Sequence, residues 1–279
     1  VRPLLMVVFA VISIVVYRYT HEEKEKMETL RQRDFIRQTF GRYLSREVVQ
    51  ELLGSPGGLE LGGESREVTF LVSDLRGFTA LTMKLSPQEV INILNRYLGR
   101  MVEVIRQYRG TLNEIEGDGI LTFFGAPLVS KDDHERAVAC AIEMQNAMEE
   151  VNAEQKRLKL PELAMGIGLN TGEVVVGNIG SEERAKYSAI GSPINTAYRV
   201  ESYAVGRQIL ISPTTYEKVE PLVQVRGTME VRFKGINQPV TLYDVSGMGG
   251  EYQVVLPEKE ERALIKVKPP IPITCLSLE

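Results

Sequence analysis

Apolar residues between positions 67 and 180 follow strand-like and helix-like patterns in turn. The segment VTFLVSDL at 68–75 is rich in β-branched and aromatic residues, which predicts a buried strand. A helix is expected after it, because Ser86, Pro87 and Glu89 form an N-cap, a first-turn proline and a capping box. The apolar face of this helix comprises Val90, Leu94, Tyr97, Leu98, Met101, Ile105 and Tyr108.

The next segment, TLNEIEGDGILTFFG at 111–125, predicts a hairpin of two short strands. Its tight turn is formed by Gly117, Asp118 and Gly119, and an Asp-Gly pair is a strong hairpin signal. A second long helix is expected over 131–157, followed by two strands over 163–170 and 172–180. The order βαββαβ with additional C-terminal strands predicts an α+β domain of ferredoxin-like type.

The first residues depart from this globular pattern, because Pro3–Tyr17 contains no charge and is dense in Leu, Val, Ile and Met. This run of about 15 residues is shorter than the roughly 20 needed to span a bilayer. Residues 1–18 are therefore expected to be the end of a transmembrane helix, with a cleaved signal peptide as the alternative. The charged flank that begins at Arg18 suits the positive-inside rule. We expect a protein of the inner membrane whose remaining residues are cytoplasmic.

Two further segments flank the predicted domain. Residues 19–58 are charged and helix-favouring, with irregularly spaced apolar residues. They predict a helical signalling linker, either a short parallel dimer stalk or a solvated connection. The cluster GSPGG at 54–58 ends any helix, so the globular domain is expected over 59–247. Residues 248–279 carry EKEER and a proline-rich run, and are expected to be a linker and the start of a further, truncated domain.

Composition narrows the classes of function. The net charge of −4 and the pI near 5.6 provide no basic surface field, so a nucleic-acid partner is not expected. The two cysteines, Cys140 and Cys275, are far apart in sequence and form neither a disulfide framework nor a metal knuckle. Acidic phosphate ligands would have to be bound by local features rather than by the overall charge.

Two aspartates are the candidate metal ligands. Asp74 ends the first predicted strand and Asp118 lies in the hairpin turn, so the two carboxylates can converge at one edge of the sheet. Magnesium takes one or two carboxylates together with waters and substrate phosphates. On its own, however, an aspartate in an Asp-Gly pair is most often only a turn residue.

Several segments, in order along the chain, resemble the class III adenylate and guanylate cyclase family over roughly residues 41–246. They are FGRYLSREVVQELL at 40–53, VSDLRGFT at 72–79, IEGDGILTFFGAP at 115–127, GIGLNTGEVVVGNIGSEERAKYSAIG at 166–191 and PINTAYRVES at 193–202. The resemblance is to bacterial membrane-anchored cyclases, which close a nucleoside triphosphate into a 3′,5′-cyclic nucleotide.

The resemblance implies a metal site on this chain. Asp74 and Asp118 would hold two ions, Mg²⁺ or Mn²⁺, with the backbone carbonyl of Leu75 as a further ligand. Phe78 and Thr79, at the end of the VSDLRGFT segment, would contact the substrate.

The resemblance also implies roles for a helix and a loop. The helix that begins near Ser192 places Asn195 and Arg199 four residues apart on one face. In the family, the matching asparagine orients the ribose and the matching arginine stabilises charge on the α-phosphate. Lys234 matches a lysine that binds the terminal phosphates. Each site would form between two chains of a homodimer, with the aspartates from one and these three residues from the other.

Two residues depart from the adenylate cyclase pattern and bear on the substrate. Glu114 stands where a lysine is usual, and Ser188 where an aspartate or threonine is usual. A glutamate accepts hydrogen bonds, as from N1 and N2 of guanine, so these positions favour GTP over ATP. The alternatives are an adenylate cyclase with atypical base contacts and a degenerate regulatory domain. A diguanylate cyclase or polymerase palm is disfavoured, because no GGDEF-like hairpin is present.

Overall fold

A computed structural model describes residues 17–19, 21, 23, 27, 60–181, 183–233, 235 and 238–257. The chain divides into two units, Val1–Leu59 and Glu60–Glu279, and the second contains the elements below. Its strands are β1 (Gly62–Leu75), β2 (Thr111–Glu116), β3 (Gly119–Phe124), β4 (Met165–Gly180), β5 (Ala185–Ile190), β6 (Ile209–Ile211), β7 (Val223–Val231), β8 (Val240–Met248) and β9 (Val254–Val255). Its helices are α3 (Phe78–Thr82), α4 (Pro87–Gln107), α5 (Asp133–Arg157), α6 (Ser192–Tyr203) and α7 (Pro213–Val219).

Within the described part of the chain, the strands form one nine-stranded sheet with the order β2-β3-β1-β4-β6-β8-β7, in which β5 pairs with β4 and β9 with β8. The β4–β6 pairing is parallel, whereas β1 runs antiparallel to both β3 and β4. The mixed α+β class and the order of elements from β1 to β4 are those that the sequence predicts, apart from the short helix α3, which the sequence analysis did not predict. The hairpin turn also lies where expected, with Gly117 in the left-handed region at φ 61°.

The prediction of two separate strands over 163–170 and 172–180 is wrong, because β4 runs without a break from Met165 to Gly180. Its register against β1 is continuous, and Thr171 and Gly172 pair with Thr69 and Val68. Gly172, near the middle of this strand, allows close packing against α6. A Cβ at Gly172 would lie 2.6 Å from the Cγ of Pro193, so the glycine lets α6 lie close to the strand.

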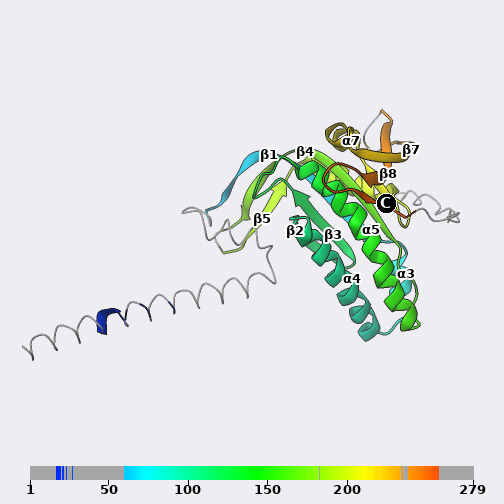
Figure 1. Cartoon of the computed structure of the whole chain (residues 1–279), viewed down its shortest axis with the longest axis horizontal. Helices are drawn as coiled ribbons and strands as arrows, with labels where there is room; N and C mark the ends of the chain where they lie inside the picture. Colours follow the sequence, from blue (N-terminus) through cyan, green and yellow to red (C-terminus); the bar gives the residue numbers. More distant parts are fainter. Residues whose placement is uncertain are drawn as a thin grey trace, which may run out of the picture. The chain divides into compact units, whose positions relative to one another are not determined.

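Helices α4 and α5 run side by side along one face of the sheet (Figure 1). The capping box of α4 is confirmed, because Ser86 Oγ accepts from the Glu89 N–H and the Glu89 carboxylate accepts from the Ser86 N–H. Alternate residues of β1 supply two cores. Leu71 packs in the core shared with the two helices, whereas Phe70 packs in the core on the opposite face. The second core includes Ala197, which attaches α6 to that face of the sheet.

Several predicted features lie outside the described residues. They include Lys234 and, apart from isolated helical positions, the segments 1–18 and 19–58. No helix in the part that the structure describes is long and apolar enough to cross a membrane. At the other end, β9 pairs with β8 and the Leu256 N–H donates to the Ser246 carbonyl at 2.8 Å, so the chain remains hydrogen-bonded to the sheet to this point.

Candidate active site

The two predicted metal aspartates converge at one edge of the sheet. Asp74 lies at the end of β1, next to Ser73, which pairs with Ile120 at the start of β3. Asp118 lies in the preceding turn, and its Oδ2 accepts a hydrogen bond of 3.1 Å from the Leu75 N–H. The backbone of β1 therefore holds the turn aspartate beside the strand aspartate.

The electrostatics of this pair indicate a place for a cation. Burial and the negative charge of Asp118 raise the pKa of Asp74 to about 6, against the opposing effect of Arg76. Two carboxylates held close together repel one another, and a divalent ion would relieve that repulsion. Among the described residues, no group of three or more His, Cys, Asp or Glu side chains forms a metal cluster. Two carboxylates suit an ion that takes its other ligands from water and phosphate.

A cavity of about 350 Å³ opens beside these aspartates. Its lining is acidic and includes Asp74, Glu114, Glu116 and Glu201, with the exposed phenol of Tyr198. Burial raises the pKa of Tyr198, and Glu114 and Glu116 contribute further in the same direction. The predicted base-contacting residue Glu114 and the predicted metal ligand Asp74 therefore share one cavity.

The residues predicted to contact the base, Glu114 and Ser188, lie on β2 and β5. Lys186 Nζ lies 3.4 Å from Glu114 Oε1, and both side chains are about half exposed. Lys186 and Ser188 are two residues apart on β5, so their side chains project from the same face of that strand. Sequence reasoning missed Lys186. The spacing of two residues from Ser188 in a strand was the signal that could have found it.

Helix α6 holds Asn195 and Arg199, and both side chains are exposed. The helix is attached to β4 at its start, where Asn170 Nδ2 donates to the Pro193 carbonyl at 2.9 Å. Neither Asn195 nor Arg199 lines the cavity that contains Asp74. Within one chain, therefore, the structure brings the metal aspartates together with Glu114 but not with the two α6 residues.

Phe78 and Thr79, the other two described residues that are predicted to contact the substrate, differ in exposure. Phe78 is buried in the core beneath the helices, whereas Thr79 is exposed and its carbonyl accepts from Thr82 Oγ1 at 2.8 Å.

Sequence reasoning also missed the ion pair between Arg76 and Glu201. The Arg76 guanidinium bonds both the carboxylate and the carbonyl of Glu201. Burial raises the pKa of Glu201, and the charge and hydrogen bond of Arg76 oppose that shift.

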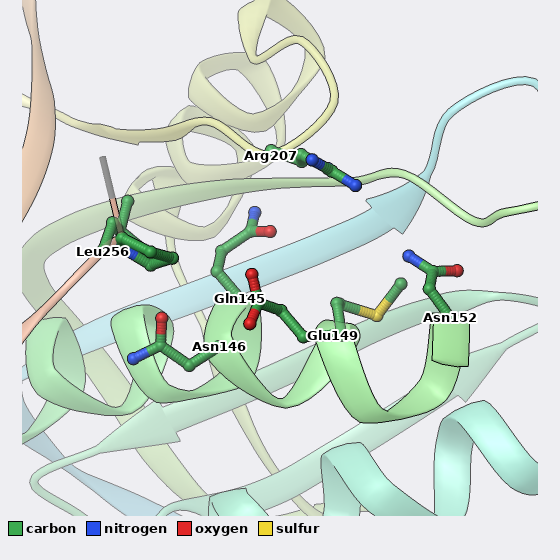
Figure 2. A pocket seen from close by; sticks show the side chains of 8 residues that line it. Gln145, Asn146, Glu149, Asn152, Arg207 and Leu256 are labelled. Atoms are coloured by element: carbon green, nitrogen blue, oxygen red, sulfur yellow. The ribbon is translucent and has the colours of Figure 1, made fainter. Parts of the chain in front are cut away.

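Figure 2 shows a second, much smaller cavity of about 30 Å³, which lies along α5. Three of its polar side chains form hydrogen bonds with main-chain groups. Gln145 donates to the Met165 carbonyl at 2.8 Å, Asn146 donates to the Val255 carbonyl at 3.2 Å, and Asn152 exchanges two hydrogen bonds with Leu163. These bonds attach α5 to the chain around it, and the space is large enough for little more than a water molecule.

Comparison with known proteins identifies the family to which this chain belongs. Residues 63–247 match the family model described as the adenylate and guanylate cyclase catalytic domain. The chain belongs to this family, whose enzymes are phosphorus–oxygen lyases.

Two bacterial relatives match most of this chain but less than half of their own length. The chain is 31% identical over 215 residues to adenylate cyclase 1 of Rhizobium meliloti, a match that covers 75% of this chain and 32% of that protein. It is 33% identical over 225 residues to the uncharacterized protein Rv1318c of Mycobacterium tuberculosis, covering 78% and 39%. The chain thus spans well under half of the length of these relatives.

Two solved structures are similar over nearly their whole length. The guanylyl cyclase Cya2 is 51% identical with a TM-score of 0.69, and the match covers 71% of this chain and all (100%) of that one. The adenylyl cyclase CyaB of P. aeruginosa is 33% identical with a TM-score of 0.64, covering 66% and 96%. The resemblance predicted from the sequence is thereby confirmed at the level of the family.

Proposed function

We propose that the chain converts a nucleoside triphosphate into its 3′,5′-cyclic monophosphate and pyrophosphate. The ribose 3′-oxygen forms a bond to the α-phosphorus, the bond to the bridging oxygen of pyrophosphate breaks, and the hydroxyl proton leaves to solvent. The observation that carries this proposal is the convergence of Asp74 and Asp118 beside a cavity that also contains Glu114. The proposal rests as well on the family to which residues 63–247 belong.

Asp74 and Asp118 are the proposed ligands of two divalent ions, Mg²⁺ or Mn²⁺, with the Leu75 carbonyl as a further ligand. Such ions lower the pKa of a hydroxyl and stabilise charge on phosphate oxygens. The protein supplies rigid carboxylates, because the Leu75 N–H fixes Asp118 and the end of β1 fixes Asp74. Both carboxylates are needed, since either alone gives an incompletely neutralised site.

Asn195 and Arg199 are proposed to act on the ribose and the α-phosphate of a substrate whose metal ions are held by a second copy of the chain. Both side chains are exposed on α6 and neither lines the cavity with Asp74, although Tyr198 and Glu201 of the same helix do, and this supports the shared arrangement. Arg199 would donate to the charge that develops on the α-phosphate, an interaction that is strongest in the transition state. Lys234 is proposed to bind the terminal phosphates of the same substrate.

GTP is the proposed substrate, with ATP as the alternative. Glu114 can accept from N1–H and N2–H of guanine, and Lys186, 3.4 Å away, can donate to O6. Adenine offers this pair one bond fewer, because it has no amino group at C2. The 51% identity to a structure named as a guanylyl cyclase supports the same choice.

The location of the enzyme is proposed from the sequence. The uncharged run Pro3–Tyr17 supports anchoring in the inner membrane, with the cyclase domain in the cytoplasm. The helical segment 19–58 would then transmit a signal from the membrane to a homodimeric cyclase domain.

Product analysis tests the proposal directly. The purified full chain is incubated with Mn²⁺ and either GTP or ATP, and the nucleotides are separated by chromatography. We expect cyclic GMP as the main product and no product from Asp118→Asn. Formation of cyclic AMP alone would contradict the choice of base, and the absence of any cyclic product would contradict the proposed activity.

A further inference from the structure

One guanidinium connects the two halves of the candidate site within a single chain. Arg76 follows Asp74 by two residues, and its Nη1 lies 3.7 Å from Asp74 Oδ2. Its Nη2 donates to both the carboxylate and the main-chain carbonyl of Glu201, the latter at 2.7 Å. Glu201 lies in α6, two residues after Arg199.

The contact between Arg76 and Glu201 is mostly buried, and closely packed glycines on β4 lie against both residues. The side chains of Arg76 and Glu201 are 24% and 10% exposed. On β4 beneath them, a Cβ at Gly166 would overlap the Arg76 guanidinium, and a Cβ at Gly168 would overlap the main chain of Glu201. In addition, the Arg76 N–H donates to the Ala164 carbonyl at 2.7 Å. The missing side chain of Gly166 therefore leaves room for the guanidinium, and that of Gly168 leaves room for the main chain of its partner Glu201.

We propose that Arg76 is a positioning residue that fixes α6, and with it Asn195 and Arg199, relative to Asp74 of the same chain. The inference rests on the proposed function. If each site takes its aspartates from one chain and its α6 residues from the other, Asp74 and Arg199 of one chain serve different sites. The bond between Arg76 and Glu201 then links the two sites of the dimer.

An arginine is required for this geometry. Its planar fork directs one nitrogen toward Asp74 and the other toward two oxygens of Glu201 at the same time. A lysine retains the positive charge but has a single nitrogen, so it cannot hold both partners. Arg76→Lys consequently tests position rather than charge.

Mixed dimers with one functional site separate the two effects of Arg76. One chain carries Asn195→Ala and Arg199→Ala and supplies only the aspartates; we term it the metal-donor chain. The other carries Asp118→Asn and supplies only the α6 residues; we term it the phosphate-donor chain. The two full-length chains carry different affinity tags, and the mixed dimer is purified over both. Arg76→Lys is then introduced into one chain at a time.

The two placements are expected to differ. In the phosphate-donor chain, Arg76→Lys lowers kcat by about a hundredfold with an unchanged half-saturating Mn²⁺ concentration, because Arg199 is displaced from the transition state. In the metal-donor chain, it raises the half-saturating Mn²⁺ concentration by about tenfold and changes kcat less, because Asp74 loses a neighbour that orients it.

Arg226→Lys is the matched control, because Arg226 pairs with Asp244 at 3.0 Å on β7 and β8 and has no place in the site. It is expected to change neither parameter in either chain. Equal losses for Arg76→Lys in both placements would overturn the proposal, because a purely structural role predicts them. An inactive mixed dimer beside an active wild-type dimer would overturn the shared site and the proposal with it. An inactive wild-type chain would instead overturn the proposed activity.

Discussion

Under the proposed function, the side chain of Glu114 is expected to determine the preference for a base. Glu114→Lys replaces an acceptor with a donor and places a second ammonium beside Lys186, 3.4 Å from the present carboxylate. Guanine then loses its partner for N1–H and N2–H, so kcat/KM for GTP should fall by roughly a hundredfold or more while the ratio of ATP to GTP turnover rises. Steady-state kinetics with both nucleotides measure this change.

Glu230→Lys is the control for that substitution, because Glu230 is an exposed strand glutamate on β7, outside the cavity. It should leave both rates as they are. An unchanged GTP to ATP ratio in Glu114→Lys would show that this residue does not contact the base.

The raised pKa of Asp74 predicts a pH dependence of metal binding. With a pKa of about 6, roughly nine-tenths of this carboxyl is ionised at pH 7 and roughly one-tenth at pH 5. A metal ion requires the ionised form, so the affinity for Mn²⁺ should be about tenfold weaker at pH 5, with protons released on binding. Calorimetry in two buffers of different ionisation enthalpy measures both quantities.

The same raised pKa has the opposite effect on the stability of the metal-free protein, which falls as the pH rises. The folded-state pKa of Asp74 is above the ordinary aspartate value of 3.8, so the stability that this group contributes is present below about pH 4 and lost as the pH rises through about 6. A metal ion removes that cost. Equal Mn²⁺ affinities at pH 5 and pH 7 would contradict the shift and its cause.

At the scale of elements, the close contact of α6 with β4 depends on a glycine, Gly168, which has no side chain to separate the two elements. Gly168→Ala would force the Cβ against the main chain of Glu201 in the middle of this interface. We expect a loss of roughly 1–3 kcal/mol in the free energy of unfolding, and a fall in kcat beyond the loss of folded protein, because Asn195 and Arg199 move with α6. Urea denaturation and kinetics on the folded fraction separate the two effects.

Gly99→Ala in α4 is the matched control, because nothing lies within 4 Å of a Cβ placed there. Alanine at an exposed helical position should stabilise the fold by about 0.5–1 kcal/mol and leave kcat unaltered. A Gly168→Ala chain with wild-type kcat would show that the site tolerates a shift of α6.

Asp132 stabilises the start of α5 and attaches it to the region of β9. Burial acts to raise its pKa, but hydrogen bonds from Ser130 and from Tyr252, the latter at 2.6 Å, outweigh this effect, and the pKa is about 2. The stabilisation is therefore present above about pH 4 and lost as the pH falls toward 2. Asp132→Asn should cost about 1 kcal/mol at pH 7, a value reduced for partial exposure, and nothing near pH 2.

Urea titrations at several pH values test this prediction. Tyr252→Phe should reproduce part of the loss, because the phenol donates one of the bonds to Asp132. A constant difference between Asp132→Asn and the wild-type chain from pH 7 to pH 2 would contradict it.

Local signals in the sequence predict the elements better than their assembly. The capping box at Ser86 and the Asp-Gly turn at Asp118 encode α4 and the hairpin with short-range chemistry, and both are present. The prediction of two strands over 163–170 and 172–180 was wrong, because the continuous pairing of β4 with β1 depends on residues about a hundred positions away in the sequence. The parallel pairing of β6 with β4 depends on contacts distant in sequence, so no local pattern indicates it.

At the scale of the whole molecule, sequence resemblance identified the family and supplied candidate site residues, but not the contacts between them. Arg76 and Glu201 are 125 residues apart, and their pairing depends on the packing of α6 across Gly166 and Gly168 on β4. The two aspartates are close within one chain, whereas Asn195 and Arg199 are exposed elsewhere on it. Under the proposed function, one copy of the fold would present two incomplete sites.

This incompleteness predicts that activity requires two chains. On dilution, the specific activity of the wild-type chain should fall in parallel with the dimer fraction measured by sedimentation. Excess Asp118→Asn chain should restore activity to dilute wild type, because each mixed dimer combines wild-type aspartates with an intact Arg199. A chain with both Asp118→Asn and Arg199→Ala should dimerise equally well and restore nothing, since it completes neither site. Constant specific activity in samples that sediment as monomers would show instead that one chain builds the whole site.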